Sequence, residues 1–204
     1  MIPLQSYLDH LAPLRVSFRG DPAMAVAGAA ADSRQIRPGH LFVAIPGSHD
    51  DGARHLPQAL ANGAVAVVAA TELAVPDGVA LLQVADAYAA AGRVAEVLHD
   101  RPADGLRLLG VTGTNGKTTT AYLLRAILAA AGRRAGMIGT VVYDTGGPAP
   151  READRTTPTP FEVQALLAEM RANGLRDAVL EVSSHSLAQR RLGAARFAGA
   201  IFTN

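Results

Sequence analysis

Short apolar runs rich in Val and Ile alternate with longer Ala- and Leu-rich stretches of helical period along most of the chain. In the first half this pattern predicts strands at 41–45, 64–69 and 79–84, with helices at 55–63 and 86–100. Strands that alternate with helices in this way are typical of βαβ units, which place parallel strands side by side. The pattern therefore predicts an α/β fold with a mainly parallel sheet.

The segment RPADG at 101–105 interrupts the pattern with Pro and Gly. We expect a domain boundary there, between an N-terminal α/β domain at 1–103 and a P-loop-containing parallel-sheet domain at 104–204. A doubly wound sheet that ends on a strand lacks its closing helix, so we expect the second domain to be incomplete and the chain to be part of a longer protein. The second domain should contain strands at 106–111, 136–143, 177–183 and 197–204 and helices at 117–131 and 159–174, the latter opened by a capping box.

The strongest chemical signal is GVTGTNGKTTT, a glycine-rich loop between the strand at 106–111 and the helix at 117–131. The phosphate-loop pattern G-x-x-x-x-G-K-[ST] is met at Gly116, Lys117 and Thr118, although Val111 replaces its first glycine. Backbone N–H groups and a helix N-terminus attract phosphate there. Lys117 is the single lysine among 19 basic residues, and its compact ammonium can reach between β- and γ-phosphates where a planar guanidinium needs more room.

A second candidate is LEVSSHSLAQRR at 180–191. Glu181 closes an apolar strand at the sheet edge where doubly wound folds bind ligands, so its carboxylate could complete a Mg²⁺ shell, although a solvated strand-end acid fits equally well. Ser183, Ser184 and His185 raise the alternative of a serine hydrolase. Adjacent strand residues point to opposite faces and no G-x-S-x-G elbow is present, so we do not expect nucleophilic catalysis.

Two polar loops are weaker candidates. Asp32, Ser33 and Arg34 precede the strand at 41–45 and a polar turn follows it, an arrangement suited to a polar ligand such as a nucleotide. Thr156 and Thr157 precede the helix at 159–174, where an anion site and a simple capping loop both fit. The histidines of the first loop lack the spacing of a helical metal site, so we interpret them as surface residues.

Composition narrows the class of protein. An apolar fraction of 49% argues against disorder, and a net charge of +1 gives no reason to expect a nucleic-acid or membrane partner. The chain has no Cys for disulfides or thiolate metal sites, and its N-terminus lacks the features of a signal peptide. The apolar runs are too short to span a bilayer. We therefore expect a soluble, cytoplasmic protein. Our expectation of a monomer does not follow from the composition.

Taken in order, DSR…PG-LFVAIPG, GVTGTNGKTTT, RTTP, EVSSHSLAQ-R and FTN resemble the Mur ligases. Within that family they are most similar to the MurE branch, and EVSSH argues against MurF. The resemblance implies an ATP- and Mg²⁺-dependent ligase whose partners are UDP-N-acetylmuramoyl-dipeptide and a free amino acid, meso-diaminopimelate first and L-lysine next. The substrate carboxylate would be phosphorylated to an acyl phosphate, which the amine of the amino acid then attacks, chemistry that asks a protein mainly for positioning and charge neutralisation.

The resemblance also implies roles for individual residues. Lys117 and Glu181 would be catalytic, and Thr118 and Glu181 would face magnesium. Arg155 stands where some relatives have Asn, so no contact is carried over to it. The family continues past FTN into an Asp-His segment, a carbamylated lysine and a further domain, so we expect these 204 residues alone to bind weakly and not to ligate. The remaining contacts would be Gly113, Thr114, Asn115, Gly116, Lys117, Thr118 and Thr119 to the ATP phosphates, Ala31, Ser33, Ser48, His49 and Asp50 to the uridine nucleotide, and Thr156, Thr157, Ser183, Gln189 and Arg191 to the muramoyl-peptide end.

Two other functions remain open. One is a P-loop small-molecule kinase with Arg151 and Arg155 in a lid, although a kinase would place its phosphate loop nearer the N-terminus. The other is a nucleotide-binding module without turnover. A ligase needs both a UDP-sugar peptide site and an ATP site, so separate titrations distinguish the three.

Overall fold

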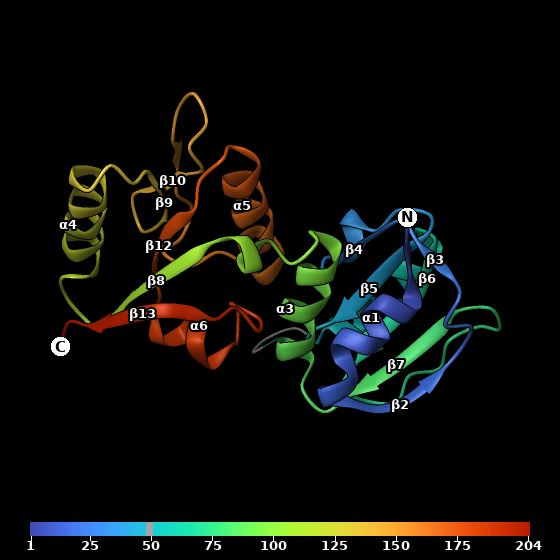
Figure 1. The fold of residues 1–204 in the computed structure, drawn as a ribbon. Helices are drawn as coiled ribbons and strands as arrows, with labels where there is room; N and C mark the ends of the chain where they lie inside the picture. Colours follow the sequence, from blue (N-terminus) through green and yellow to red (C-terminus); the bar gives the residue numbers. More distant parts are fainter. Residues whose placement is uncertain (48–50) are drawn as a thin grey trace. The chain divides into compact units, whose positions relative to one another are not determined.

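The computed structural model describes residues 1–47 and 51–204, and the chain divides into two compact units, residues 1–98 and 99–204 (Figure 1). Each unit has its own sheet with helices on both faces, which confirms the expected α/β class. The second unit begins at His99, just before the RPADG segment. In the described part of the chain, no helix is both long and apolar enough to cross a membrane.

The first unit is built on a five-stranded sheet in the order β2-β7-β6-β5-β4, in which only the edge strand β2 runs antiparallel to its neighbour. The strands and helices expected between 41 and 100 are confirmed within a few residues. The elements before residue 31 were not predicted, because their apolar runs are short. In chain order the unit contains β1 (Ile2–Pro3), α1 (Leu4–Leu11), β2 (Arg15–Arg19), β3 (Ala25–Val26), β4 (Gly28–Ala30), β5 (His40–Ala44), α2 (Leu56–Ala61), β6 (Ala64–Ala69), β7 (Ala80–Val84) and α3 (Ala87–Leu98).

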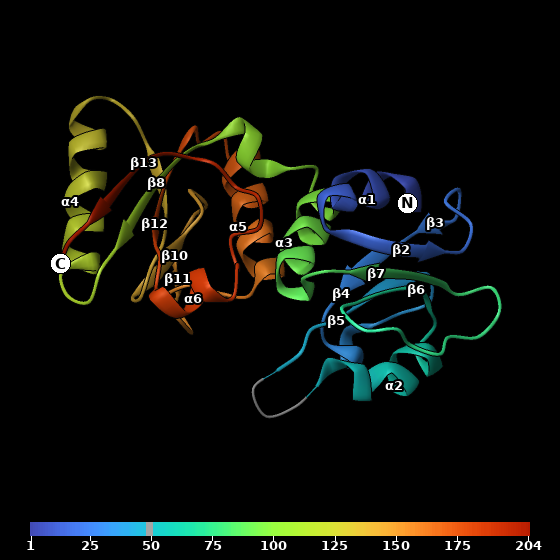
Figure 2. The same ribbon diagram turned by 90° about the horizontal axis from the view of Figure 1, so that it is seen from below.

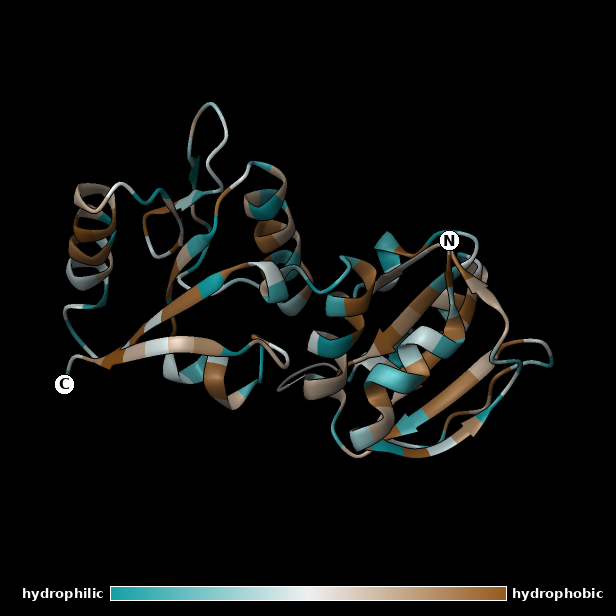
Figure 3. Ribbon diagram, viewed as in Figure 1, coloured by the Kyte–Doolittle hydropathy of each residue, from teal (hydrophilic) through white to brown (hydrophobic). Residues whose placement is uncertain are grey.

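Helices α1 and α3 cover one face of this sheet and α2 covers the other (Figure 2). Leu41, Phe42 and Val43 in β5 are all fully buried, as expected for a central strand covered on both faces. The strands are accordingly the most apolar part of the unit (Figure 3). Since β4 and β5 are parallel, the segments that follow them emerge at the same edge of the sheet, and this edge carries the candidate site of the first unit.

The second unit has a six-stranded sheet in the order β11-β10-β9-β12-β8-β13. Strands β9, β12, β8 and β13 are parallel, and β10 and β11 extend the sheet antiparallel. The capping box of α5 is confirmed, with Thr159 and Glu162 bonding each other's backbone N–H. The elements are β8 (Arg107–Thr112), α4 (Lys117–Ala130), β9 (Ala135–Ile138), β10 (Val142–Asp144), β11 (Arg151–Glu152), α5 (Pro160–Ala172), β12 (Asp177–Glu181), α6 (Ser184–Ala188) and β13 (Phe197–Phe202).

Alternation along these strands builds two cores, one on each side of the sheet. Figure 1 shows α4 and α5 on opposite sides of β9 and β12. Met137 and Val179 pack with α4, whereas Ile138 and Leu180, one residue further on, pack with α5. This period of two confirms a sheet that is buried on both faces.

The strand expected at 136–143 is wrong in one respect. The structure breaks it into β9 and β10, which pair antiparallel through a tight turn at 139–141. The apolar run continues through the turn as Val141 and Val142, so hydrophobicity did not mark it. The turn closes with a hydrogen bond from the Gly139 N–H to the Val142 carbonyl. The turn lies beside the end of β12, where the Thr140 N–H donates to the Glu181 carboxylate.

Asp177, at the start of β12, is buried to 1% exposure and is held by two arginines of neighbouring segments. Its Oδ2 accepts from Arg107 Nη2 at 3.3 Å and from Arg133 Nε at 3.1 Å, and Arg107 Nε lies 3.0 Å from its Oδ1. Burial by itself would raise the pKa of this carboxyl, but the hydrogen bonds and charges of Arg133 and Arg107 outweigh it, and the pKa lies below its usual value.

We expect Asp177→Asn to lower the free energy of unfolding by about 1–2 kcal/mol at neutral pH, since charged hydrogen bonds are lost but both arginines are partly exposed. A lowered folded-state pKa stabilises the fold above the unfolded pKa of about 3.9, and this contribution disappears as the pH falls through the folded value. Urea unfolding should therefore show the variant and the wild type converging in stability as the pH falls below about 4. A constant difference across that range would contradict the role of the ionised carboxylate.

Candidate functional site

The glycine-rich loop joins β8 to α4 in the second unit, as the sequence predicts. Gly113 has a φ of 131° and Gly116 a φ of 80°, values that disfavour any residue with a side chain. At Gly113 a Cβ would also come within 2.2 Å of Thr203 Oγ1. Both glycines are therefore required by the shape of the loop, and α4 begins directly at Lys117.

The ammonium of Lys117 folds back over this loop. Its Nζ donates to the carbonyl oxygens of Gly113 at 2.7 Å and Thr114 at 3.0 Å. These bonds hold a positive charge at the loop, where it adds to the partial positive charge of the α4 N-terminus. The combination favours an anion with several oxygens, such as a polyphosphate.

Thr203 and Asn204, which follow β13, form hydrogen bonds with the backbone of the loop. Asn204 Oδ1 accepts from the N–H groups of Thr114 at 2.8 Å and Asn115 at 3.0 Å. Thr203 Oγ1 donates to the Asn115 carbonyl at 2.6 Å. We assigned no role to these two side chains from the sequence. The signal that could have found them is their position at the end of β13, which runs parallel to β8.

Glu181 ends β12 and is fully buried. Its Oε2 accepts from the hydroxyls of Thr118 at 2.8 Å and Thr140 at 3.0 Å, and its Oε1 accepts from the Thr140 N–H at 3.1 Å. The structure thus brings Thr118 and Glu181 together, 63 residues apart in the chain. A solvated strand-end acid, the alternative considered for Glu181, is wrong. Thr140 was missed because the run at 136–143 predicted a continuous strand.

The donor set around Glu181 fits a hard divalent cation. A carboxylate and a hydroxyl supply oxygen ligands, and Mg²⁺ is usually bound by one or two carboxylates together with waters and phosphate oxygens. The carboxylate is buried among neutral hydrogen-bond donors and forms no ion pair with the described residues, so a nearby cation would offset its charge. Among the described residues there is no cluster of three or more His, Cys, Asp or Glu, so the protein alone would not form a complete cation cage.

The residues assigned to the muramoyl-peptide end lie around the same strand end. Thr157 Oγ1 donates to the Glu181 carbonyl at 2.9 Å and accepts from the Ser183 N–H at 3.2 Å. Arg191 donates to the Thr157 carbonyl at 2.7 Å and to Gln189 Oε1 at 2.8 Å. The hydroxyl oxygens of Thr156 and Thr140 lie 3.1 Å apart, within hydrogen-bond distance. One network therefore joins these residues to Glu181.

Ser183 does not continue the strand. It is the N-cap of α6, where its hydroxyl accepts from the Ser186 N–H at 3.1 Å. The strand expected at 177–183 thus ends at Glu181, so Ser183 and Ser184 do not lie on opposite faces of a strand, contrary to our expectation. The helix forms because Ser183 can satisfy an orphan N–H of its first turn.

Gly139 makes room for the buried carboxylate. A Cβ on this residue would lie 2.4 Å from Glu181 Oε1 and 3.1 Å from its carboxyl carbon. We expect Gly139→Ala to displace Glu181 from Thr118 and to reduce Mg²⁺-dependent ATP binding by about 10-fold, the equivalent of one strong hydrogen bond. The matched control is Gly199→Ala on β13, where the added carbon would meet Leu109 at an ordinary 3.7 Å. Equal ATP affinities in the two variants, measured by calorimetry, would show that Gly139 is not needed for this geometry.

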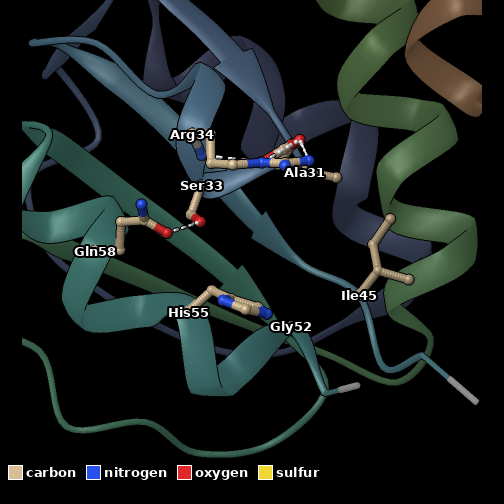
Figure 4. Close-up of a pocket in the computed structure, with 8 residues that line it drawn as sticks. Ala31, Ser33, Arg34, Ile45, Gly52, His55 and Gln58 are labelled. Carbon is tan, nitrogen blue, oxygen red and sulfur yellow. Dashed lines mark hydrogen bonds and ion pairs between the residues drawn. The ribbon is translucent and has the colours of Figure 1, made fainter. Parts of the chain in front are cut away.

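The first unit contains a separate pocket of about 470 Å³ at the sheet edge where β4 and β5 end (Figure 4). Ala31 and Ser33, expected to contact a nucleotide, both line it, whereas Ser48, His49 and Asp50 lie outside the described residues. His55 and Gln58 also line the pocket and were not predicted from the sequence; His55 is partly exposed there. The full lining is Ala31, Asp32, Ser33, Arg34, Ile45, Gly52, His55 and Gln58.

Two of the residues that line this pocket form an ion pair. Arg34 Nη2 lies 2.7 Å from Asp32 Oδ2, and the Arg34 N–H also donates to Asp32 at 2.9 Å. The side-chain hydrogen bond from Arg34 lowers the pKa of Asp32 below its usual value, so this carboxylate stays ionised at neutral pH. Asp32 also caps the 3-10 helix at Ser33–Gln35 and so sets the direction of Ser33.

Comparison with known proteins gives consistent matches for both units. Residues 26–103 match the Mur ligase family, catalytic domain, and residues 111–204 match the Mur ligase middle domain. A ligase of Geobacter sulfurreducens, UDP-N-acetylmuramoyl-L-alanyl-D-glutamate–2,6-diaminopimelate ligase, is 43% identical over 192 residues, covering 93% of this chain and 37% of that protein. The protein of the same name from Gloeobacter violaceus is 41% identical, covering 100% of this chain and 41% of that one.

Solved structures are similar as well. A structure of a UDP-N-acetylmuramoyl-L-alanyl-D-glutamate–2,6-diaminopimelate ligase superposes with a TM-score of 0.78 at 27% identity, covering 100% of this chain and 40% of that one. MurF from Acinetobacter baumannii matches with a TM-score of 0.58 at 22% identity, covering 89% and 35%, and supports the fold alone. The chain spans about two fifths of the length of the curated relatives it matches.

Proposed function

Because this chain belongs to the Mur ligase family, of which it carries the N-terminal and middle domains, we propose that its two sites serve one amide-forming reaction. The pocket of the first unit binds the uridine nucleotide of a UDP-N-acetylmuramoyl-dipeptide. The loop of the second unit binds the phosphates of ATP. The amino acid joined to the dipeptide is a diaminopimelate, as in the names of the relatives. Both nucleotides are cytoplasmic metabolites, so we also place the protein in the cytoplasm.

The observation that carries this proposal is the meeting of Thr118 and Glu181 beside the loop, with 2.8 Å between hydroxyl and carboxylate oxygens. Thr118 and Glu181 would hold Mg²⁺, which supplies charge neutralisation on the phosphates when bound. Lys117 contributes the second positive charge. The glycine-rich loop orients the nucleotide through backbone N–H groups other than those of Thr114 and Asn115, which donate to Asn204. The network around Thr157 and Arg191 positions the substrate carboxylate near the same strand end.

In this reaction the free carboxylate oxygen of the D-glutamyl residue forms a bond to the γ-phosphorus and ADP leaves. The amine of the incoming amino acid then attacks the acyl carbon, loses a proton, and expels inorganic phosphate. Charge develops first on the phosphoryl oxygens, which is where Lys117 and the α4 N-terminus add positive potential. The residues of this chain therefore serve mainly the first half of the reaction.

Two separate calorimetric titrations test the proposal. In one, UDP-N-acetylmuramoyl-L-alanyl-D-glutamate is titrated into the chain, and in the other Mg-ATP is titrated into it. We expect each to bind on its own. If Mg-ATP binds and the UDP-linked ligand does not, a P-loop kinase is favoured instead. If the UDP-linked ligand binds and Mg-ATP does not, a module without turnover is favoured. Either result would contradict the ligase.

A further inference from the structure

Ser33 is held from two directions by one face of α2. The Ser33 hydroxyl donates to Gln58 Oε1 at 2.6 Å, and the Ser33 carbonyl accepts from Asn62 Nδ2 at 2.8 Å. Gln58 lies on α2 and Asn62 is the C-cap of that helix, four residues later and hence on the same face. Figure 4 shows the carboxamide of Gln58 pointing at the Ser33 hydroxyl at the wall of the pocket.

This arrangement decides what Ser33 can do toward a ligand. A serine hydroxyl has one hydrogen to donate and two lone pairs with which to accept. Gln58 takes the single hydrogen, so the oxygen that lines the pocket retains only accepting capacity. Ser33 itself is only 4% exposed, and its main chain is fixed by Asn62, so the hydroxyl cannot readily move to another partner.

We propose that Gln58 is a positioning residue that sets Ser33 as a hydrogen-bond acceptor, so that the pocket selects ligands with a donor at this point. The inference rests on the proposed binding of a uridine nucleotide. Uridine has donors of two kinds, the N3–H of the base and the hydroxyls of the ribose. A ligand that offers an acceptor or a C–H there leaves the buried Ser33 oxygen unsatisfied, which carries a free-energy penalty.

Three analogues of UDP identify the donor. In CDP the base presents an acceptor N3 in place of the N3–H donor, whereas 2′-fluoro-2′-deoxy-UDP and 3′-fluoro-3′-deoxy-UDP each replace one ribose hydroxyl by a fluorine that can accept but not donate. We expect the wild-type chain to bind one of the three analogues about 10- to 100-fold more weakly than it binds UDP, because one buried hydrogen bond is lost. The analogue that is rejected shows whether Ser33 accepts from the base or from the ribose.

Variants at Gln58 separate selection from structure. Gln58 is exposed on the surface of α2, so substitution there leaves the core intact. In Gln58→Met the Ser33 hydroxyl hydrogen loses its acceptor and can be donated to an acceptor on the ligand, so the preference for UDP over the rejected analogue should fall below about threefold. Gln58→Glu still accepts from Ser33, so the preference should survive even if the added negative charge weakens binding of every diphosphate.

Gln35→Met is the matched control, an exposed glutamine of the same segment outside the pocket lining, and it should retain the wild-type preference. A wild-type preference that persists in Gln58→Met, or no preference for UDP over any of the analogues, would overturn the inference while leaving the uridine site standing. Failure of the wild-type chain to bind UDP at all would overturn the site and the selection together.

Discussion

Replacement of Lys117 by arginine is expected to lower the affinity for Mg-ATP by about 10- to 100-fold, the range for loss of hydrogen bonds to a charged partner. The ammonium reaches two loop carbonyls within 3.0 Å, a position set by the glycine backbone at 113 and 116. A guanidinium keeps the charge, but its planar fork is larger and cannot occupy the same point. Calorimetric titration of ATP into the variant measures the loss.

The control for this variant reverses the exchange elsewhere in the same unit. Arg134→Lys changes an exposed arginine whose Nη2 donates to the Gly146 carbonyl at 3.2 Å, and it should leave ATP affinity unchanged. UDP affinity and thermal stability should be unchanged in both variants. Wild-type ATP affinity in Lys117→Arg would mean that any cation suffices and that the single lysine has no special role at the loop.

Glu181→Gln should remove the ability of Mg²⁺ to strengthen ATP binding. The amide keeps the size of the carboxylate, and the hydroxyls of Thr118 and Thr140 can rotate to accept from it, so the fold should survive. A neutral amide is a poor ligand for Mg²⁺, which prefers carboxylate oxygen. We expect the Mg²⁺-dependent gain in ATP affinity to fall by about 10- to 100-fold, whereas ATP affinity without Mg²⁺ is unchanged or higher because a negative charge near the phosphates is gone.

The comparison with and without Mg²⁺ separates this role from a structural one. A variant that merely loosens the strand end would lose ATP affinity equally under both conditions. A loss confined to the Mg²⁺ titration supports a metal-binding carboxylate. An unchanged response to Mg²⁺ in Glu181→Gln would require that the cation be held by residues other than the Thr118 and Glu181 pair.

Features that depend on neighbours in the sequence could be predicted. The strand, glycine loop and helix around Lys117 are one continuous segment, so local pattern and loop chemistry were sufficient. The capping box at Thr159 and Glu162 is equally local. Parallel topology also allowed Glu181 to be placed near the loop, because the carboxyl ends of adjacent parallel strands share one edge.

Features that depend on partners far along the chain could not be predicted. Gly139 is needed because of Glu181, 42 residues later, and the turn after it is masked by a continuing apolar run. Gln58 resembles any exposed helix residue until the fold places it against Ser33. Asn204 braces the loop only through the pairing of β13 with β8. In each case the information lies in tertiary contact rather than in periodicity.

The most direct test of two nucleotide sites on this chain is a backbone ¹H–¹⁵N NMR titration with each ligand in turn. Mg-ATP should shift amides of the loop from Gly113 to Thr119 together with Thr140, and UDP should shift Ala31, Ser33 and Arg34 with the surrounding pocket residues. Two separate sets of shifted amides are the result we predict. Shifts by both nucleotides at one common set, or no shift at the loop with Mg-ATP, would contradict the assignment of an ATP site and a uridine site to these two units.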